Sequence, residues 1–212
     1  YYSYASELGE KPQKLVDDFK MACDYLVENH EIVNSLHGLY DHEFIFEGGQ
    51  GIMLDTDYGF FPHVTRSYTT ARNALEIIKT IPFGVDINTY YVTRAYLTRH
   101  GNGYMPNEEL NTDFIIENPD ETNQDRGLQG KFRKAPLDLD LLKYAIHCNR
   151  YHMKGEGREK MVVTCLDQVP TRIPVTIDGK LVEVEWKDIP SYCGIPFKYA
   201  SHSSEGKLND NI

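Results

Sequence analysis

Apolar residues recur along the chain at two spacings, which separate expected helices from expected strands. From Lys11 to His30 the spacing is helical and predicts an amphipathic helix with one buried stripe. A second helix is expected at roughly Thr69 to Thr80, and a third, capped by Asp138, extends to about Tyr151. The stripe of the first helix consists of Leu15, Val16, Phe19, Ala22, Cys23, Leu26 and Val27.

Short apolar runs predict the strands. Phe44-Ile45-Phe46 and the range from Lys160 to Cys165 are typical of buried strands. The range from Ile87 to Leu97 is rich in Tyr, Val and Thr and predicts one further strand. From Thr98 to Lys134 the chain is polar and rich in Gly, Pro and Asn, which indicates a long functional or disordered loop.

A β-hairpin is predicted near the C-terminus. Asp178-Gly179 lies between two β-branched runs, Ile173 to Ile177 and Leu181 to Glu185. Pro174 cannot donate a ladder hydrogen bond and favours an edge strand there. Alternating helices and short apolar strands predict an α/β fold in a single domain over residues 1–212.

Composition is that of an ordinary globular protein, and the charge narrows the classes of partner. The 212 residues are 41% apolar and 25% charged, and no apolar run is long enough to span a membrane. A net charge of −10 argues against a general nucleic-acid binder but permits a local nucleotide site. The four cysteines form no Cys-x-x-Cys pair, so neither a zinc site nor a redox motif is indicated. The opening Tyr1-Tyr2-Ser3-Tyr4 lacks a signal-peptide pattern. We expect that sequence preceding Tyr1 in the natural protein is missing from this chain.

The most informative motif follows the first expected strand, where Glu47-Gly48-Gly49-Gln50-Gly51 lets the backbone turn sharply and approach a ligand closely. Gln50 offers a donor and an acceptor suited to the edge of a base. Thr65, ahead of the second helix, is placed to hold a phosphate. On composition alone, a glycine-rich turn without a ligand explains the motif equally well.

The full stretch from Phe46 to Thr65 resembles the signature of adenylosuccinate synthetases, Phe-Glu-Gly-x-Gln-Gly-x-x-Leu-Asp-x-Asp-x-Gly-x-x-Pro-x-Val-Thr, and shows each of its fixed positions. The resemblance implies a P-loop-NTPase-like, mostly parallel sheet flanked by helices, from which the N-terminal part of the family domain is absent. It places Gln50 near the six position of a bound purine as the catalytic candidate, and Thr65 at the nucleotide phosphate. Gly49, Gly51 and Arg66 complete the expected substrate-nucleotide site.

Two further blocks extend the resemblance. Ala95 to Glu108 is similar to the family's Ala-Tyr-x-Thr-Arg-x-Gly-x-Gly-x-x-Pro-x-Glu segment, in which Arg99 suits an anion. The stretch from Gln129 to Lys134 lies where larger family members have an arginine-rich loop that grips aspartate. Candidates for contacts with aspartate or phosphate are therefore Arg99, Thr122, Lys131 and Arg133. Without the family, such a basic run is most often a solvated surface.

The resemblance also implies a site for the base of the phosphate donor. Asp167 follows a strand where the family has Lys-Leu-Asp, and a carboxylate can accept two N–H bonds from guanine. Cys165 replaces the usual Lys, which leaves GTP and ATP both open as donors. Ser201 and Gly206 are candidates in a small-residue turn beside that base. An Asp after a buried strand is equally common as a cap or turn residue.

The implied activity is a ligase reaction in purine nucleotide biosynthesis. L-Aspartate condenses with a 6-oxopurine nucleotide, IMP or dGMP, through a 6-phosphoryl intermediate formed from GTP or ATP. Phe61 to Ser67 resembles viral relatives that act on deoxyguanylate and make a 2-aminoadenine precursor. The family also implies Mg²⁺, with ligands upstream of this chain, a homodimer, and a cytoplasmic location.

The resemblance leaves room for a different class of protein. The family's catalytic Asp and His and its phosphate loop precede the matched region, so we expect the 212 residues alone to have no turnover. The alternative is a non-catalytic nucleotide-binding module, or an inactive fragment of such an enzyme. It would bind one nucleotide without supporting phosphate release.

Overall fold

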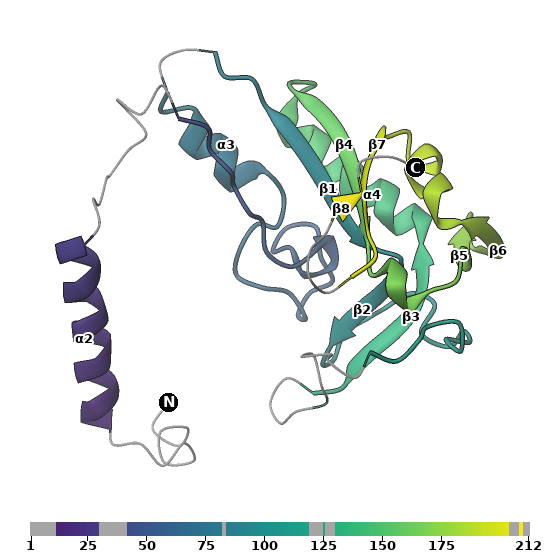
Figure 1. Cartoon of the computed structure of the whole chain (residues 1–212), viewed down its shortest axis with the longest axis horizontal. Helices are drawn as coiled ribbons and strands as arrows, with labels where there is room; N and C mark the ends of the chain where they lie inside the picture. Colours follow the sequence, from purple (N-terminus) through teal and green to yellow (C-terminus); the bar gives the residue numbers. More distant parts are fainter. Residues whose placement is uncertain are drawn as a thin grey trace. The chain divides into compact units, whose positions relative to one another are not determined.

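The computed structural model describes residues 12–29, 42–81, 84–118, 125, 130–203 and 208–209. Contacts divide the chain into two compact units, Tyr1–His42 and Glu43–Ile212 (Figure 1). In the described residues the α-helices are α2 (Pro12–Asn29) in the first unit, and α3 (Arg72–Ile78), α4 (Leu139–Met153) and α5 (Ile189–Tyr192) in the second. The strands are β1 (Asn88–Arg94), β2 (Tyr96–His100), β3 (Phe132–Asp138), β4 (Arg158–Thr164), β5 (Arg172–Ile177), β6 (Lys180–Glu185), β7 (Phe197–Ser201) and β8 (Leu208–Asn209).

Helix α2 confirms the first expected helix almost to the residue. The prediction that it buries an apolar stripe is wrong for the described structure, because Phe19 and Val27 are 70% and 67% exposed. An amphipathic stripe is buried only when a second element packs against it. Among the described residues, the first unit contains no element besides α2.

The first sheet of the second unit has the strand order β1-β4-β7-β8. Strands β1, β4 and β7 run parallel, and β8 is antiparallel to β7. Helix α4 covers one face of this sheet, where Asn149 bonds Tyr91 of β1 and Arg150 bonds Glu159 of β4 (Figure 1). On the other face Val92 is 66% exposed. The predicted α/β fold, with a parallel sheet flanked by helices, is confirmed.

The second sheet has the order β2-β3-β5-β6 and mixes directions. Strands β5 and β6 form the predicted hairpin, with Asp178 and Gly179 both at positive φ (50° and 68°), as a type I′ turn requires. The prediction of an edge strand at Pro174 is wrong, because β5 lies between β3 and β6. Proline is tolerated there because pairing with β3 begins only at Val175.

The predicted strand from Ile87 to Leu97 is in fact two strands in two sheets. The chain bends at Ala95, which is fully buried and donates its N–H to the Thr164 carbonyl oxygen (3.1 Å). β1 ends before the bend in the first sheet, and β2 continues after it in the second. Periodicity could not show the break because both strands are rich in β-formers.

The other local predictions are mostly confirmed. Strand β4 and helix α4 form where expected, and the Asp138 carboxylate caps α4 by accepting bonds from the Asp140 and Leu141 amides (both 2.9 Å). Helix α3 forms but is shorter than predicted. The polar stretch after Thr98 is likewise shorter than predicted at both ends, because β2 extends to His100 and β3 begins at Phe132.

The predicted buried strand at Phe44-Ile45-Phe46 is wrong. The three residues are irregular, and Ile45 is 96% exposed. A short apolar run becomes a strand only when a neighbouring strand satisfies its backbone. None of the strands that the structure describes pairs with it.

Candidate functional site

The glycine-rich turn leads into an irregular but well-bonded segment, residues 51–71, here called the acceptor segment. Just before it, Gln50 is exposed and adopts a left-handed conformation (φ 62°). Within the segment, the Leu54 amide bonds the Gly51 carbonyl oxygen (2.9 Å), and the Leu54 carbonyl oxygen accepts from the Thr65 amide (2.7 Å). These two bonds tie the turn after Gln50 to Thr65, fifteen residues further along the chain.

Asp55 organises the acceptor segment from its centre. Its side chain is fully buried and accepts hydrogen bonds from the amides of Asp57 (2.8 Å), Tyr58 (3.1 Å) and Thr69 (2.6 Å), and from the Thr69 hydroxyl (3.2 Å). Burial by itself would raise the pKa of this carboxyl, but the hydrogen bonds outweigh it and lower the pKa below its ordinary value. Asp55 is therefore an ionised, internally solvated group that joins both ends of the segment.

Gly59 is required by the same close packing. A Cβ at this position would lie 2.5 Å from the Met53 carbonyl oxygen and 2.6 Å from that of Asp55. By contrast, a Cβ at Gly49 or Gly51 would meet no atom within 4 Å. The backbone beside Gln50 is thus open to a ligand, whereas the backbone at Gly59 is closed.

Arg99 joins the acceptor segment to the second sheet. Its guanidinium donates from Nη2 to the His63 carbonyl oxygen (2.8 Å) and from Nε to that of Asn102 (3.3 Å). Arg99 is 6% exposed, and its Nη1 is buried without a hydrogen-bond partner among the described residues. Burial lowers the pKa of Arg99, and the neighbouring charge of Arg133 lowers it further. A buried cation with an unused donor is a place where an anion would be stabilised.

Arg133 faces Arg99 across the antiparallel pair of β2 and β3. It forms an ion pair with Glu108 (2.6 Å) and donates to the Gly103 carbonyl oxygen (2.8 Å), while its Nε has no partner in the described structure. Among the described residues, Glu108 forms an ion pair with Arg133, and no ion pair is found for the neighbouring Arg99. The local charge balance favours an added anion.

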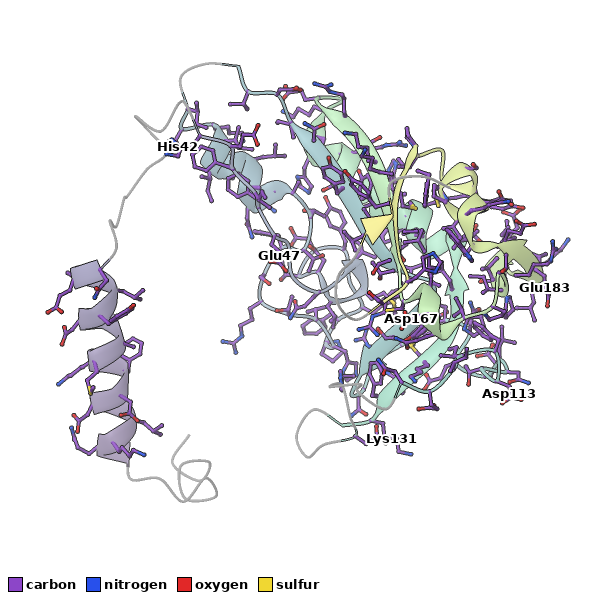
Figure 2. All side chains as sticks on the ribbon, in the orientation of Figure 1. His42, Glu47, Asp113, Lys131, Asp167 and Glu183 are labelled. Carbon is purple, nitrogen blue, oxygen red and sulfur yellow. The ribbon has the colours of Figure 1, made fainter. Side chains whose placement is uncertain are left out.

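The remaining candidates for this anion site contribute less. Lys131 is exposed directly before β3, where its backbone carbonyl oxygen accepts from the Gly101 amide (3.0 Å) (Figure 2). Arg66 is also exposed. Thr122 lies outside the described residues. The structure thus brings Gly51, Thr65, Arg99 and Arg133 into one connected group, with Lys131 at its rim.

The candidates for the donor base lie at the carboxyl ends of two neighbouring parallel strands. Asp167 is exposed in a short 3-10 helix, Leu166–Gln168, that follows β4 (Figure 2), and Ser201 is the last residue of β7. Because β4 and β7 are parallel partners, both residues lie at the same edge of the sheet, the one formed by the carboxyl ends of the strands. Ligands in open α/β sheets bind at this edge. Gly206 lies outside the described residues.

Two buried polar residues that pattern analysis did not single out support these elements. Gln168 accepts a hydrogen bond from the Tyr96 hydroxyl (2.6 Å), and its carbonyl oxygen accepts from the Ile116 amide (2.8 Å). Asn149 of α4 accepts from the Ala71 amide (2.8 Å). No sequence signal separates such residues from exposed amides, because their role depends on contacts distant in the chain.

Neither a metal cluster nor a membrane span is found in the described part of the chain. No group of three His, Cys, Asp or Glu side chains there could hold a metal ion. None of the described helices is long and apolar enough to cross a membrane.

The fold and the placement of polar groups define a mixed α/β domain of the class with ligand sites at strand ends. Residues 4–191 match the family model for adenylosuccinate synthetase. The chain belongs to the adenylosuccinate synthetase family.

Individual relatives agree with this assignment. The chain is 32% identical to the adenylosuccinate synthetase of Koribacter versatilis over 91% of its own length and 40% of that protein. It is 29% identical to the Saccharomyces cerevisiae enzyme over 90% of its length and 46% of that protein. It therefore spans less than half the length of these relatives.

A solved structure shows the same fold. Fully ligated adenylosuccinate synthetase from Plasmodium falciparum superposes with a TM-score of 0.61 at 17% identity, covering 97% of this chain and 60% of that one.

Proposed function

We propose that this chain supplies the acceptor-nucleotide and aspartate pockets of a ligase that joins L-aspartate to C6 of a 6-oxopurine nucleotide. The observation that carries the proposal is the connected group formed by the acceptor segment and Arg99. Gln50, presented beside open backbone, would face the six position of the purine, and Thr65 would hold the 5′-phosphate. The acceptor is IMP or dGMP.

The reaction runs in two balanced steps. First, the purine N1 loses its proton to a base, the bond between the β,γ-bridging oxygen and the γ-phosphorus of GTP or ATP breaks so that GDP or ADP departs with the electron pair, and a bond forms from that phosphorus to the purine six-oxygen. The aspartate amine then forms a bond to C6, the C6–O bond breaks, and phosphate departs with the electron pair while the amine loses a proton. Gln50 can orient the base edge because its amide both donates and accepts.

The two arginines suit the anionic partner in this scheme. Arg99 Nη1 and Arg133 Nε are buried donors without partners in the described structure, and a carboxylate of aspartate or a phosphate oxygen would satisfy them. Asp167 can accept two N–H bonds from a guanine donor, with Ser201 at the same sheet edge. Mg²⁺, if bound by a longer form of the protein, would neutralise charge on the transferring phosphoryl group. The homodimer and the cytoplasmic location stay predictions from the resemblance.

Calorimetric titration of the 212-residue chain with IMP, dGMP, inosine and deoxyguanosine tests the acceptor site. We expect one nucleotide to bind, and its nucleoside to bind more weakly because the phosphate contact at Thr65 is lost. We also expect no succinyl-nucleotide when aspartate, GTP or ATP, and Mg²⁺ are added. Failure of both nucleotides to bind would refute the acceptor site, whereas metal-dependent product would refute the prediction that this chain alone has no turnover.

The same titration separates the two acceptors. Tighter binding of dGMP than of IMP would support the viral branch, and the reverse would support an ordinary inosinate-using enzyme. In a protein of full family length, nucleotide binding without phosphate release would instead favour a non-catalytic module.

A further inference from the structure

One face of helix α4 contacts the acceptor segment at three points. The Tyr144 hydroxyl donates to the Tyr58 carbonyl oxygen (3.0 Å), and the Tyr58 hydroxyl lies 2.9 Å from His152 Nε2. Between these two contacts along the helix, Asn149 Oδ1 accepts from the Ala71 amide (2.8 Å). The acceptor segment has no regular structure over most of its length, so α4 is the rigid element against which it is held.

Asn149 also forms a hydrogen bond with the first sheet. Its Nδ2 donates to the Tyr91 hydroxyl (3.1 Å), which in turn donates to Glu159 (2.7 Å). Burial raises the pKa of Tyr91, which keeps its hydroxyl protonated as a donor. Asn149 is 6% exposed, so its amide bridges segment and sheet away from solvent.

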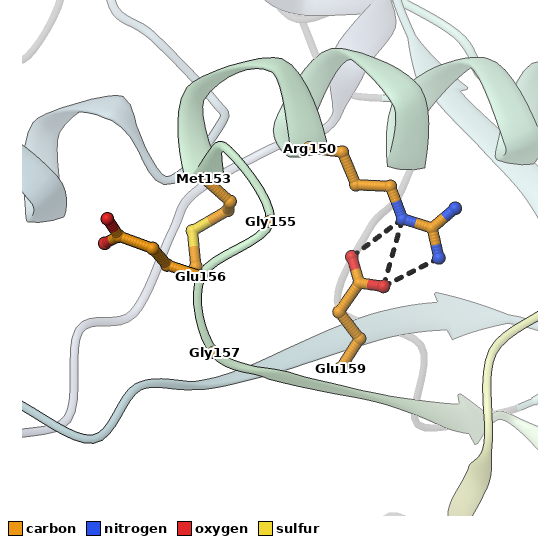
Figure 3. Close-up of a pocket in the computed structure, with 6 residues that line it drawn as sticks. All are labelled: Arg150, Met153, Gly155, Glu156, Gly157 and Glu159. Atoms are coloured by element: carbon orange, nitrogen blue, oxygen red, sulfur yellow. Dashed lines mark hydrogen bonds and ion pairs between the residues drawn. The ribbon is translucent and has the colours of Figure 1, made fainter.

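The far end of this chain of bonds is anchored by an ion pair. Arg150 donates to both carboxylate oxygens of Glu159, the shortest contact being 2.6 Å, beside a small cavity of about 140 Å³ (Figure 3). Glu159 is thereby held by β4 and α4 together. The bond from Asn149 Nδ2 to the Tyr91 hydroxyl fixes the orientation of the Asn149 side-chain amide, so that its Oδ1 faces the Ala71 N–H.

We propose that Asn149 is a positioning residue for the acceptor nucleotide: it contacts no ligand, but holds the C-terminal end of the acceptor segment so that Thr65 stays in register with Gln50. The role of Asn149 in nucleotide binding rests on the proposed function. Its role in holding the segment does not. Loss of the Asn149 acceptor deprives the partly buried Ala71 amide of its hydrogen bond, and the segment end is released.

The test uses the 212-residue chain and two variants. Asn149→Leu removes the acceptor at similar volume, and Tyr91→Phe removes the two bonds of the Tyr91 hydroxyl, to Asn149 and to Glu159, while it leaves the Asn149–Ala71 bond in place. Hydrogen–deuterium exchange of residues 51–71 and the affinity for IMP and dGMP are measured for each. We expect Asn149→Leu to speed exchange across the segment and to weaken nucleotide binding by about tenfold, and Tyr91→Phe, which keeps the Ala71 bond but lets the Asn149 amide turn, to change each by less, about two- to threefold.

A third variant guards against loss of the fold. Ala71→Pro deletes the donor of the same bond, and the native φ of −66° at Ala71 suits proline. Faster exchange in Asn149→Leu or Ala71→Pro with no loss of nucleotide affinity would overturn the positioning role, as would unchanged exchange. If the unaltered chain binds neither nucleotide, the proposed function fails by itself, and the exchange measurement still decides whether Asn149 holds the segment.

Discussion

Two neighbouring stretches of the chain behave in opposite ways. Phe44-Ile45-Phe46 is strongly apolar but irregular and exposed, whereas residues 51–71 are of mixed polarity yet folded around a buried carboxylate. The apolar run depends on elements outside itself, because a strand cannot satisfy its own backbone. The acceptor segment carries its own hydrogen-bond acceptor in Asp55 and is ordered from within.

The largest effect should follow from removing that acceptor. In the parent chain an Asp55 carboxylate oxygen accepts a hydrogen bond from the Thr69 amide (2.6 Å). Asp55→Asn can place an NH2 group at that position, so that two donors face each other. We expect a loss of about 3 kcal/mol in the free energy of unfolding of the second unit, measured by urea denaturation, and loss of nucleotide binding. If the variant were as stable as the parent, Asp55 would not be the group that orders the acceptor segment.

The same residue predicts a pH dependence. Because the pKa of Asp55 is lower in the folded chain than in the unfolded one, its contribution is fully present above the unfolded value, about 3.9, and is lost as pH falls through the folded value. The difference in unfolding free energy between the parent and Asp55→Asn should therefore shrink steadily below about pH 4. A difference that stays constant down to pH 2 would contradict an ionised Asp55.

A smaller loss is expected from filling the space at Gly59. Gly59→Ala places a methyl group against two backbone carbonyl oxygens that cannot move independently, and should cost about 2 kcal/mol in urea denaturation. Gly49→Ala is the matched control, since its Cβ would meet nothing within 4 Å. The control should keep its stability and lose nucleotide affinity if the ligand approaches that backbone.

Arg99 tests the link between the segment and the second sheet. Arg99→Lys cannot reach both the His63 and Asn102 carbonyl oxygens, so we expect it to lose about 1.5 kcal/mol of stability and to bind nucleotide more weakly. Lys131→Gln serves as the control because Lys131 is exposed. It should leave the thermal midpoint unchanged. An equal loss of stability in both variants would show that the hydrogen bonds of Arg99 do not stabilise the link between the segment and the second sheet.

The smallest effect is expected in the apolar stretch. Ile45→Ser alters a side chain that is 96% exposed, and the unfolding free energy of the chain should change by less than about 0.5 kcal/mol. A clear destabilisation would mean that the run is buried in solution, and would remove the contrast with the acceptor segment.

The sequence predicts best where local chemistry is sufficient. The Asp138 cap and the Asp178-Gly179 turn are decided by residues a few positions apart, and both elements formed as expected. The bend at Ala95 and the central place of Pro174 depend on which strand lies alongside, information that periodicity does not contain. The prediction that Pro174 lies in an edge strand was wrong for that reason.

The candidate site divides in the same way. The resemblance marked Gln50, Thr65, Arg99 and Arg133, and the structure connects the segment to both arginines, although their roles stay predictions. It did not mark Asn149, whose partner Ala71 lies 78 residues away. Nor did it distinguish Asp55 as a hub from its exposed neighbour Asp57, because burial is a property of the folded chain.

The bend at Ala95 has a mechanical consequence. β1 and β2 are separated by that single residue, with no loop to absorb a twist between the two sheets. Any rotation of one sheet against the other must pass through the φ and ψ angles of one fully buried alanine, which leaves little room for them to change. The edge that carries Asp167 and the strand that carries Arg99 are therefore expected to move as one body.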